Sequence, residues 1–208
     1  MLSKSGFNLW ANHYDNTVHI SEENNDYPFA GYKQILNIIF NEVMQKTYSN
    51  VLDIGFGTGV LTSKLHENGH QIDGLDFSPK MISIAKSKMP NAHLIEWDIS
   101  KGLPSEIVNK RYDSIVSTYT LHHLTDREKV SFVSKLLSLL KEEGKIIIGD
   151  ISFQSREELN ECRQKNLHHW DDDEFYFVFD ELKSALASIC NCKFQPISHC
   201  GGIIVISK

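Results

Sequence analysis

Residues 51–59 read VLDIGFGTG, an apolar run that leads into three glycines spaced two residues apart. The apolar residues of VLDI are typical of the first strand of a parallel sheet that is covered on both faces. Gly55, Gly57 and Gly59 then let the chain turn sharply into a helix, and they carry no side chain that would block a ligand lying against the backbone. The stretch therefore predicts a nucleotide-like cofactor site at the carboxyl end of a strand.

The residues around these glycines distinguish between cofactor classes. A triphosphate-binding P-loop closes with Gly-Lys-Ser/Thr, whereas Gly59 is followed by Val60 and Leu61. A dinucleotide fingerprint has its third glycine three positions after the second, which is the position of Val60. Asp53 precedes the glycines, where its negative charge would repel a pyrophosphate but attract an ammonium group. The sequence therefore favours a cationic amino-acid cofactor over NAD.

The stretch resembles motif I of the class I S-adenosylmethionine-dependent methyltransferases, and later motifs of that family follow in the same order. Residues 72–76 (IDGLD) predict a second strand. In the family, the acid that Asp76 matches binds the two ribose hydroxyls, and a carboxylate with two acceptor oxygens suits a cis-diol. Phe77 is expected to lie against the adenine. Residues 94–99 (LIEWDI) predict the third strand, and Asp98 matches the acid that accepts a hydrogen bond from the adenine amino group.

The resemblance implies S-adenosyl-L-methionine as the cofactor, together with a set of residues that bind it. These residues are Asp53, Gly55, Gly57, Gly59, Asp76, Phe77, Asp98, Ile99, Ser117 and Tyr14. Two alternatives stay open, namely a noncatalytic or regulatory domain that binds the same cofactor and an NAD-dependent oxidoreductase. Val60 argues against the second alternative, because dinucleotide enzymes have a glycine there.

Strands alternate with helices along the chain, which is typical of an α/β, doubly wound parallel sheet. Residues 32–46 carry apolar side chains at helical spacing. Ser78 and Pro79 form a typical N-cap and first-turn pair, and Met89 with Pro90 is expected to end that helix.

The second half of the chain continues this alternation. Thr125 and Glu128 predict a capping box for a helix that ends at about Gly144. Residues 145–149 (KIIIG) predict a fifth buried strand. The terminal strands are expected at residues 194–199 and 202–206. In the resembled family this pair is a reversed β-hairpin, which implies a Rossmann-like, mostly parallel sheet of seven strands.

Composition limits the classes of function. The chain has 208 residues, which we expect to form one domain (1–208), and its 21 basic and 27 acidic residues give a net charge of −6. No basic stretch is interleaved with aromatic residues, so nucleic acid is a poor partner. No apolar run approaches the roughly 20 residues that span a bilayer, and the start MLSKSGFNLW lacks the apolar region of a signal peptide. We therefore expect a cytoplasmic protein, and the oligomeric state stays open.

The four cysteines are Cys162, Cys190, Cys192 and Cys200, and they contain no C-x-x-C pair. Reduced thiols are therefore expected. Three of these cysteines and His199 cluster in sequence near the C-terminus, but their spacings do not match a zinc site. We assign no metal.

Two segments outside the predicted core are expected to belong to the substrate side. Residues 1–30 contain Trp10, Tyr14 and Asp15, and in similar enzymes a segment with these residue types folds over the cofactor as a lid. An ordinary helix docked on the sheet edge is the alternative. Residues 152–179 are expected to shape the substrate pocket, as additions at this point do in related enzymes.

The second of these segments carries an acidic helix and a mixed cluster. Glu157, Glu158 and Glu161 are expected on the helix, and residues 168–174 read HHWDDDE. The cluster has the chemistry to attract an amine or bind a metal, but it also matches a solvated acidic loop.

The reaction that the resemblance implies is in-line displacement of a methyl group from a sulfonium by a nucleophile. His122 follows the predicted fourth strand and is the first candidate for a general base, with His123 second. A structural loop histidine is the alternative. Tyr119 is expected beside His122 at the point where the methyl group should lie.

Residues 117–120 (STYT) contain no proline, whereas enzymes that methylate exocyclic base amines carry Asn or Asp-Pro-Pro-aromatic at this point. A small-molecule acceptor is therefore expected. The strings WANHYD and VSTYTLHHLTDREK are most similar to small uncharacterised bacterial methyltransferases associated with methionine-to-cysteine recycling.

Overall fold

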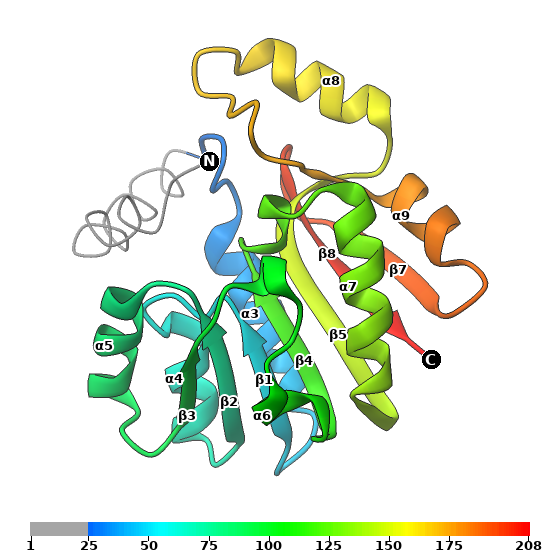
Figure 1. The fold of residues 1–208 in the computed structure, drawn as a ribbon. Helices are drawn as coiled ribbons and strands as arrows, with labels where there is room; N and C mark the ends of the chain where they lie inside the picture. The colour runs from blue at the N-terminus through cyan, green and yellow to red at the C-terminus, as the bar shows by residue number, and fades with distance from the viewer. Residues whose placement is uncertain (1–24) are drawn as a thin grey trace.

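One sheet with parallel central strands organises residues 25–208, which are the residues that the computed structural model describes. The strands are β1 (Asn50–Ile54), β2 (Gln71–Asp76), β3 (His93–Glu96), β4 (Tyr112–Thr118), β5 (Leu140–Phe153), β6 (Phe177–Val178), β7 (Asn191–Pro196) and β8 (Gly201–Ser207). They follow the order β3-β2-β1-β4-β5-β8-β7 (Figure 1). The short β6 pairs with β5 beside this path. β8 is antiparallel to both β5 and β7, which confirms the predicted Rossmann-like α/β sheet with its reversed C-terminal hairpin.

Helices cover both faces of the sheet. They are α3 (Tyr32–Val43), α4 (Val60–Glu67), α5 (Pro79–Lys88), α6 (Ser105–Val108), α7 (Asp126–Ser138), α8 (Arg156–Lys165) and α9 (Phe179–Leu186), with the 3₁₀ turns η1 (Ile99–Lys101) and η2 (Leu121–His123). The apolar faces of α3 and α4 pack into one core cluster, and those of α7 and α9 pack into another. Figure 1 shows α8 apart from these layers, beyond one end of the sheet.

The helix starts follow the local chemistry that the sequence predicts. The hydroxyl of Ser78 accepts a hydrogen bond from the amide of Met81, and Pro79 occupies the first turn of α5. Thr125 and Glu128 form both halves of the capping box of α7. These local signals therefore place two helices that flank the carboxyl ends of the strands.

The predicted end of α7 at about Gly144 is wrong. The helix ends at Ser138, and β5 begins at Leu140 instead of Lys145. Leu140 pairs with Tyr112 of β4, and both side chains are buried. This buried pairing outweighs the helix preference of the polar residues that follow.

Two strand boundaries also differ from the prediction. The third strand ends at Glu96 instead of Ile99, because Asp98 caps η1 by accepting the amide hydrogen of Ser100 at 3.0 Å. The seventh strand ends at Pro196, and the hydroxyl of Ser198 then accepts the amide of Gly201 at 2.9 Å and closes the turn to β8.

The segment from 152 to 179 contains α8, which carries Glu157, Glu158 and Glu161 as predicted. Trp10, Tyr14 and Asp15 of the expected lid lie outside the described residues. No helix within residues 25–208 is both long enough and apolar enough to cross a membrane.

Candidate active site

A cavity of about 760 Å³ opens at the carboxyl ends of β1, β2, β3 and β4. Ligand sites of open α/β sheets occupy this edge. Its lining residues are Gly55, Leu75, Asp76, Phe77, Glu96, Trp97, Asp98, Ile99, Ser100, Lys101, Thr120, His123, Leu124, Thr125, Glu128 and Phe175. The structure thus brings together five of the predicted cofactor-binding residues, which come from three different strand ends.

The three glycines of the turn after β1 serve different purposes. All three have positive φ angles, of 74° at Gly55, 55° at Gly57 and 79° at Gly59. A Cβ at Gly55 would collide with the side chain of Thr120, and one at Gly59 would lie 2.8 Å from the Cε of Met89. Among the described residues, a Cβ at Gly57 would meet nothing within 4 Å. Gly57 is therefore the glycine that keeps space open, whereas the other two make room for protein side chains.

Asp76 stands at the end of β2 and is held by the backbone. Its Oδ2 accepts the amide hydrogen of Gly57 at 2.8 Å, and its Oδ1 accepts that of Ser78 at 2.9 Å. Burial raises the pKa of Asp76 to about 6, although these amide donors act in the opposite direction. Each carboxylate oxygen has two lone pairs, so acceptor capacity remains for hydroxyl donors in the cavity.

The far wall of the cavity comes from the end of β3 and from η1. Asp98 and Ile99 line it as predicted, and Phe77 lines it after β2. The Oδ1 of Asp98 also accepts hydrogen bonds from Ser100, so this carboxylate is both a helix cap and a cavity wall. Trp97, which was not predicted as a site residue, also lines the cavity, and its indole donates to the carbonyl of Gly102 at 2.8 Å.

Asp53 and Ser117 are not among the lining residues of this cavity. Asp53 is 1% exposed, and its Oδ2 accepts a hydrogen bond from the hydroxyl of Thr62 at 2.5 Å. Within residues 25–208, its Oδ1 has no hydrogen-bond partner. Burial raises the pKa of Asp53 to about 7, against the bond from Thr62. The hydroxyl of Ser117 donates to the carbonyl of Ile54 at 2.9 Å and links β4 to β1.

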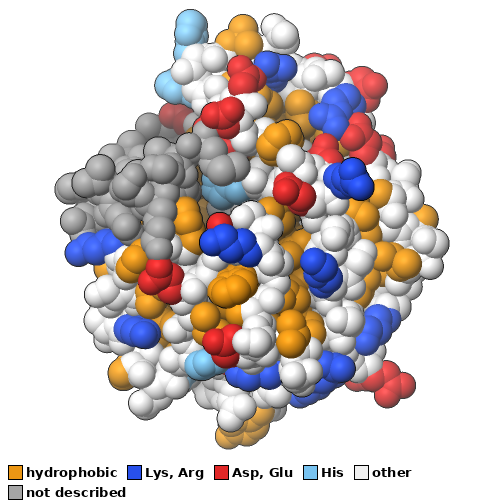
Figure 2. All heavy atoms as spheres, in the orientation of Figure 1, with side chains coloured by type: hydrophobic (Ala, Val, Ile, Leu, Met, Phe, Trp, Pro, Cys, Tyr) orange, Lys and Arg blue, Asp and Glu red, His pale blue; other side chains and the backbone are white. Residues whose placement is uncertain are grey.

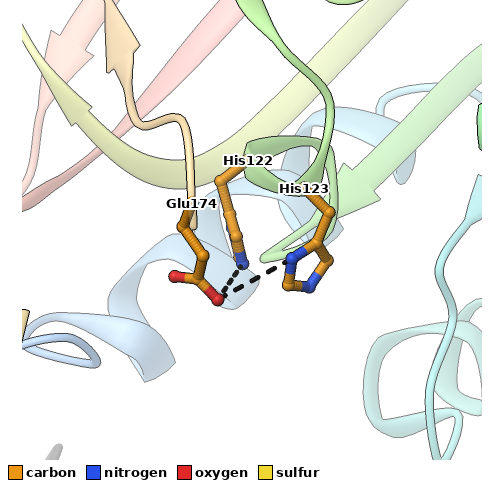
Figure 3. Close-up of side chains that lie close together, drawn as sticks. All are labelled: His122, His123 and Glu174. Carbon is orange, nitrogen blue, oxygen red and sulfur yellow. Dashed lines mark ion pairs between the residues drawn. The ribbon is translucent and has the colours of Figure 1, made fainter. Parts of the chain in front are cut away.

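A group of ionisable side chains borders the cavity on the side of η2. His122 and His123 belong to η2, and Glu174 precedes β6. The Nε2 of His122 lies 3.6 Å from the Oε1 of Glu174, and the Nδ1 of His123 lies 3.7 Å from the same oxygen (Figure 3). On its other side, the Nδ1 of His122 lies 2.6 Å from the Oδ1 of Asp150 on β5. No local sequence pattern connects these residues.

The two histidines have opposite pKa shifts. Burial alone would lower the pKa of His122, but the charges of Asp150 and Glu174 outweigh burial and raise it. Burial and the neighbouring charge of His122 lower the pKa of His123 to about 3. His123 is therefore a neutral imidazole at pH 7. His122 is 5% exposed and does not line the cavity, whereas His123 does.

Tyr119 lies between β4 and η2 in the chain, and its ring belongs to an aromatic group. Its φ angle is 48°, an uncommon value for a residue other than glycine, and its ring packs 5.3 Å from the rings of both Phe29 and Tyr32. Tyr119 is buried and is not among the residues that line the cavity.

The segment before α3 meets the segment that follows α8. Tyr27 stacks on Trp170 with ring centroids 5.5 Å apart, and its hydroxyl donates to that of Tyr176. The hydroxyl of Tyr176 donates in turn to the Oε2 of Glu174 at 2.9 Å. Parts of the two segments expected on the substrate side therefore lie together beside the histidines.

Comparison with known proteins gives a consistent result. The family described as "Methyltransferase domain" matches residues 51–144. An uncharacterized methyltransferase of Alkaliphilus oremlandii is 34% identical over 97% of this chain and 90% of its own length. One of Geobacillus sp. is 38% identical over 85% of this chain and 83% of its own.

Solved structures share the fold at lower sequence identity. DhpI in complex with SAM and HEP has a TM-score of 0.70 at 17% identity, covering 98% of this chain and 95% of that one. An S-adenosylmethionine-dependent methyltransferase from Clostridium acetobutylicum has a TM-score of 0.68 at 16% identity, covering 93% and 98% of the two chains.

Proposed function

The chain belongs to the methyltransferase family, and we propose that it transfers a methyl group from S-adenosylmethionine to a small-molecule acceptor. When bound, S-adenosylmethionine supplies an electrophilic methyl group on a sulfonium. The observation that carries the proposal is the position of Asp76. Its carboxylate is held by the amides of Gly57 and Ser78 at the edge of a cavity whose other border carries His123.

The cavity residues suit the parts of this cofactor. Asp76 retains lone pairs for the ribose hydroxyls, and Phe77 offers a ring for the adenine. Asp98 lies on the wall where the adenine amino group would donate a hydrogen bond. We propose that the ligand reaches the turn after β1 through the space over Gly57, where a Cβ would meet no described atom within 4 Å. We assign the Oδ1 of Asp53, which has no hydrogen-bond partner in the described part of the chain, as the acceptor for the cofactor's ammonium end.

The remaining cofactor contacts are proposed by resemblance. Gly55 and Ile99 line the cavity, while Gly59, Ser117 and Tyr14 complete the implied set. We propose that Ser117 stabilises the site without lining the cavity, because its hydrogen bond to Ile54 joins the ends of β4 and β1.

The acceptor is proposed to lie between η2 and the 152–179 segment. His122 is the residue that we propose to assist removal of the acceptor's proton, because Asp150 orients its ring and Glu174 faces its second nitrogen. Tyr119 is proposed to shape the same end of the site. Most of the catalysis is positioning, which lowers the activation free energy by on the order of 7–11 kcal/mol when two reactants are held near attack distance.

A nucleic-acid acceptor fits this surface poorly. Figure 2 shows basic and acidic side chains interspersed on the face in view. Such a surface lacks the continuous positive potential that attracts phosphates. We therefore propose a small molecule as the acceptor. We also propose a cytoplasmic setting. The association with methionine-to-cysteine recycling is proposed from the sequence resemblance alone.

Calorimetry with S-adenosylhomocysteine and with NAD tests the cofactor assignment. We expect S-adenosylhomocysteine to bind and NAD not to bind, since Val60 occupies the position of the third dinucleotide glycine. Tighter binding of NAD would reject the assignment. A noncatalytic domain would bind S-adenosylhomocysteine but transfer no methyl group.

A further inference from the structure

We propose that His122, His123 and Glu174 form a binding site for a divalent transition-metal ion such as zinc, on the acceptor side of the cavity. The existence of this site is independent of the proposed function, and only its use in methyl transfer rests on that function. Within the described residues, this is the group of three or more His, Cys, Asp or Glu side chains whose ligand atoms lie close enough to share an ion.

The distances from Glu174 to the two histidines are close to those between the ligands of a metal ion. A tetrahedral ion with bonds of 2.0–2.2 Å separates its ligand atoms by about 3.3–3.6 Å. The Oε1 of Glu174 lies 3.6 Å from the Nε2 of His122 and 3.7 Å from the Nδ1 of His123, and all three atoms lie within 4.8 Å of one another. Figure 3 shows both rings directed at the carboxylate of Glu174. Two imidazoles and one carboxylate are also a ligand set of catalytic zinc, which leaves a coordination position open.

Two of the three ligands are oriented by partners behind them. The Nδ1 of His122 faces the Oδ1 of Asp150 at 2.6 Å, which leaves Nε2 for an ion. The hydroxyl of Tyr176 donates to the Oε2 of Glu174 at 2.9 Å, which leaves Oε1 for the same ion. Metal-binding histidines typically have such a carboxylate partner, and the partner fixes the ring and its tautomer. The arrangement is therefore a supported site and not a chance approach of three side chains.

The charges of the site also favour a cation. Asp150 is 0% exposed, and its Oδ2 has no hydrogen-bond partner within residues 25–208. Glu174 is mostly buried and faces the opposite nitrogen of His122, so two carboxylates face the imidazoles in a region of low dielectric. The buried Lys129 on α7 is a nearby cation, but its ammonium group binds Asp126 and the carbonyl of Phe175. A divalent ion would compensate the carboxylates directly.

The position of the site indicates its use and the class of acceptor. His123 and Phe175 line the cavity, so an ion bound here would have its open coordination position near the acceptor. That position suits an acceptor with an oxygen donor, such as a hydroxyl or carboxylate group. With the ion bound, His122 would act on the acceptor as a ligand of the ion and not as the general base proposed for the metal-free site.

Cobalt and zinc titrations of the full chain, freed of metal by a chelator, test the site. We expect saturable binding of one Co²⁺ per chain, with the visible bands of a four- or five-coordinate nitrogen and oxygen site and displacement by Zn²⁺. Absence of saturable binding at millimolar metal would overturn the proposal. Thiolate-to-cobalt charge-transfer bands would overturn it as well, because they would place the ion on the cysteines.

Variants locate the ion. His123→Ala and Glu174→Gln should each weaken Zn²⁺ binding by more than about 100-fold, and Tyr176→Phe should weaken it about tenfold by freeing the carboxylate. His199→Ala removes an exposed histidine and should keep the wild-type affinity. Wild-type affinity in both ligand variants would reject the site.

Calorimetry of S-adenosylhomocysteine with the metal-free protein separates the two proposals. Retained cofactor binding without metal binding would reject the metal site alone. Metal binding without cofactor binding would reject the proposed function alone.

Discussion

The amide of Gly57 donates a hydrogen bond to the Oδ2 of Asp76 at 2.8 Å, and this bond joins the turn after β1 to the end of β2. Both residues were predicted to bind the cofactor, and the bond makes the geometry of each depend on the other. Asp76 is therefore fixed before any ligand arrives.

Asp76→Ala should weaken S-adenosylhomocysteine binding by on the order of 1–3 kcal/mol, because it removes the proposed ribose acceptor and leaves the two amides without their partner. Calorimetry measures the loss, and Glu106→Ala on the exposed surface is the control. Wild-type affinity in Asp76→Ala, with an unchanged circular dichroism spectrum, would place the cofactor elsewhere.

Gly57→Ala tests the open space over the turn. The new methyl group would meet no atom of residues 25–208 within 4 Å beyond its chain neighbours, but it would enter the proposed cofactor volume. Gly69→Ala is a matched control, because Gly69 also has a positive φ, of 89°, and its Cβ would lie 3.4 Å from Tyr48. We expect both variants to lose about 1–2 kcal/mol of stability. Calorimetry should show weaker S-adenosylhomocysteine binding only for Gly57→Ala, and equal affinities in the two variants would contradict the assignment.

The pKa of Asp53 predicts how stability depends on pH. Its folded-state pKa is about 7, against 3.8 for an ordinary aspartate. Its contribution to the free energy of unfolding is therefore full at low pH and is lost as pH rises from about 3.8 through 7. Between pH 5 and pH 8, ionisation of this group should lower the free energy of unfolding of the cofactor-free protein by on the order of 2–3 kcal/mol. Asp53→Asn should remove this part of the dependence and be the more stable protein at pH 8. Urea denaturation of both proteins checks this, and a difference between them that stays constant with pH would show that Asp53 is already ionised.

His122→Ala separates chemistry from cofactor binding. Because His122 does not line the cofactor cavity, S-adenosylhomocysteine affinity should stay within a few fold. Turnover should fall by ~10²–10⁴ if His122 activates the acceptor, either directly or as a metal ligand. Tyr119→Phe tests the tyrosine hydroxyl in the same assay, and His199→Ala is the control. An unfolded His122→Ala protein would show that the residue is structural.

Local sequence signals account for most of the fold and for the cofactor side of the site. The glycine turn after β1 and the Thr125–Glu128 capping box are formed by neighbouring residues, so their structure follows from short stretches. The start of β5 at Leu140 depends on pairing with Tyr112, which a local pattern does not contain. The polar residues 141–143 therefore indicated a helix that continues to Gly144, although they belong to β5.

The acceptor side was less predictable for the same reason. His122 meets Asp150 across 28 residues of sequence, and Tyr27 meets Tyr176 across 149. Glu174 belongs to a stretch that reads as a solvated acidic loop, and only the folded chain brings it to the histidines. Spacing rules for metal ligands could not identify a site assembled from segments so far apart.

Transfer of a labelled methyl group from S-adenosylmethionine into the small-molecule fraction of a cell extract tests the central claim most directly. We predict that the wild-type protein labels a small molecule, that Asp76→Ala does so far more slowly at limiting cofactor, and that nucleic acid stays unlabelled. Label that appears only in nucleic acid, or no label in any fraction from a protein that binds S-adenosylhomocysteine, would contradict the account.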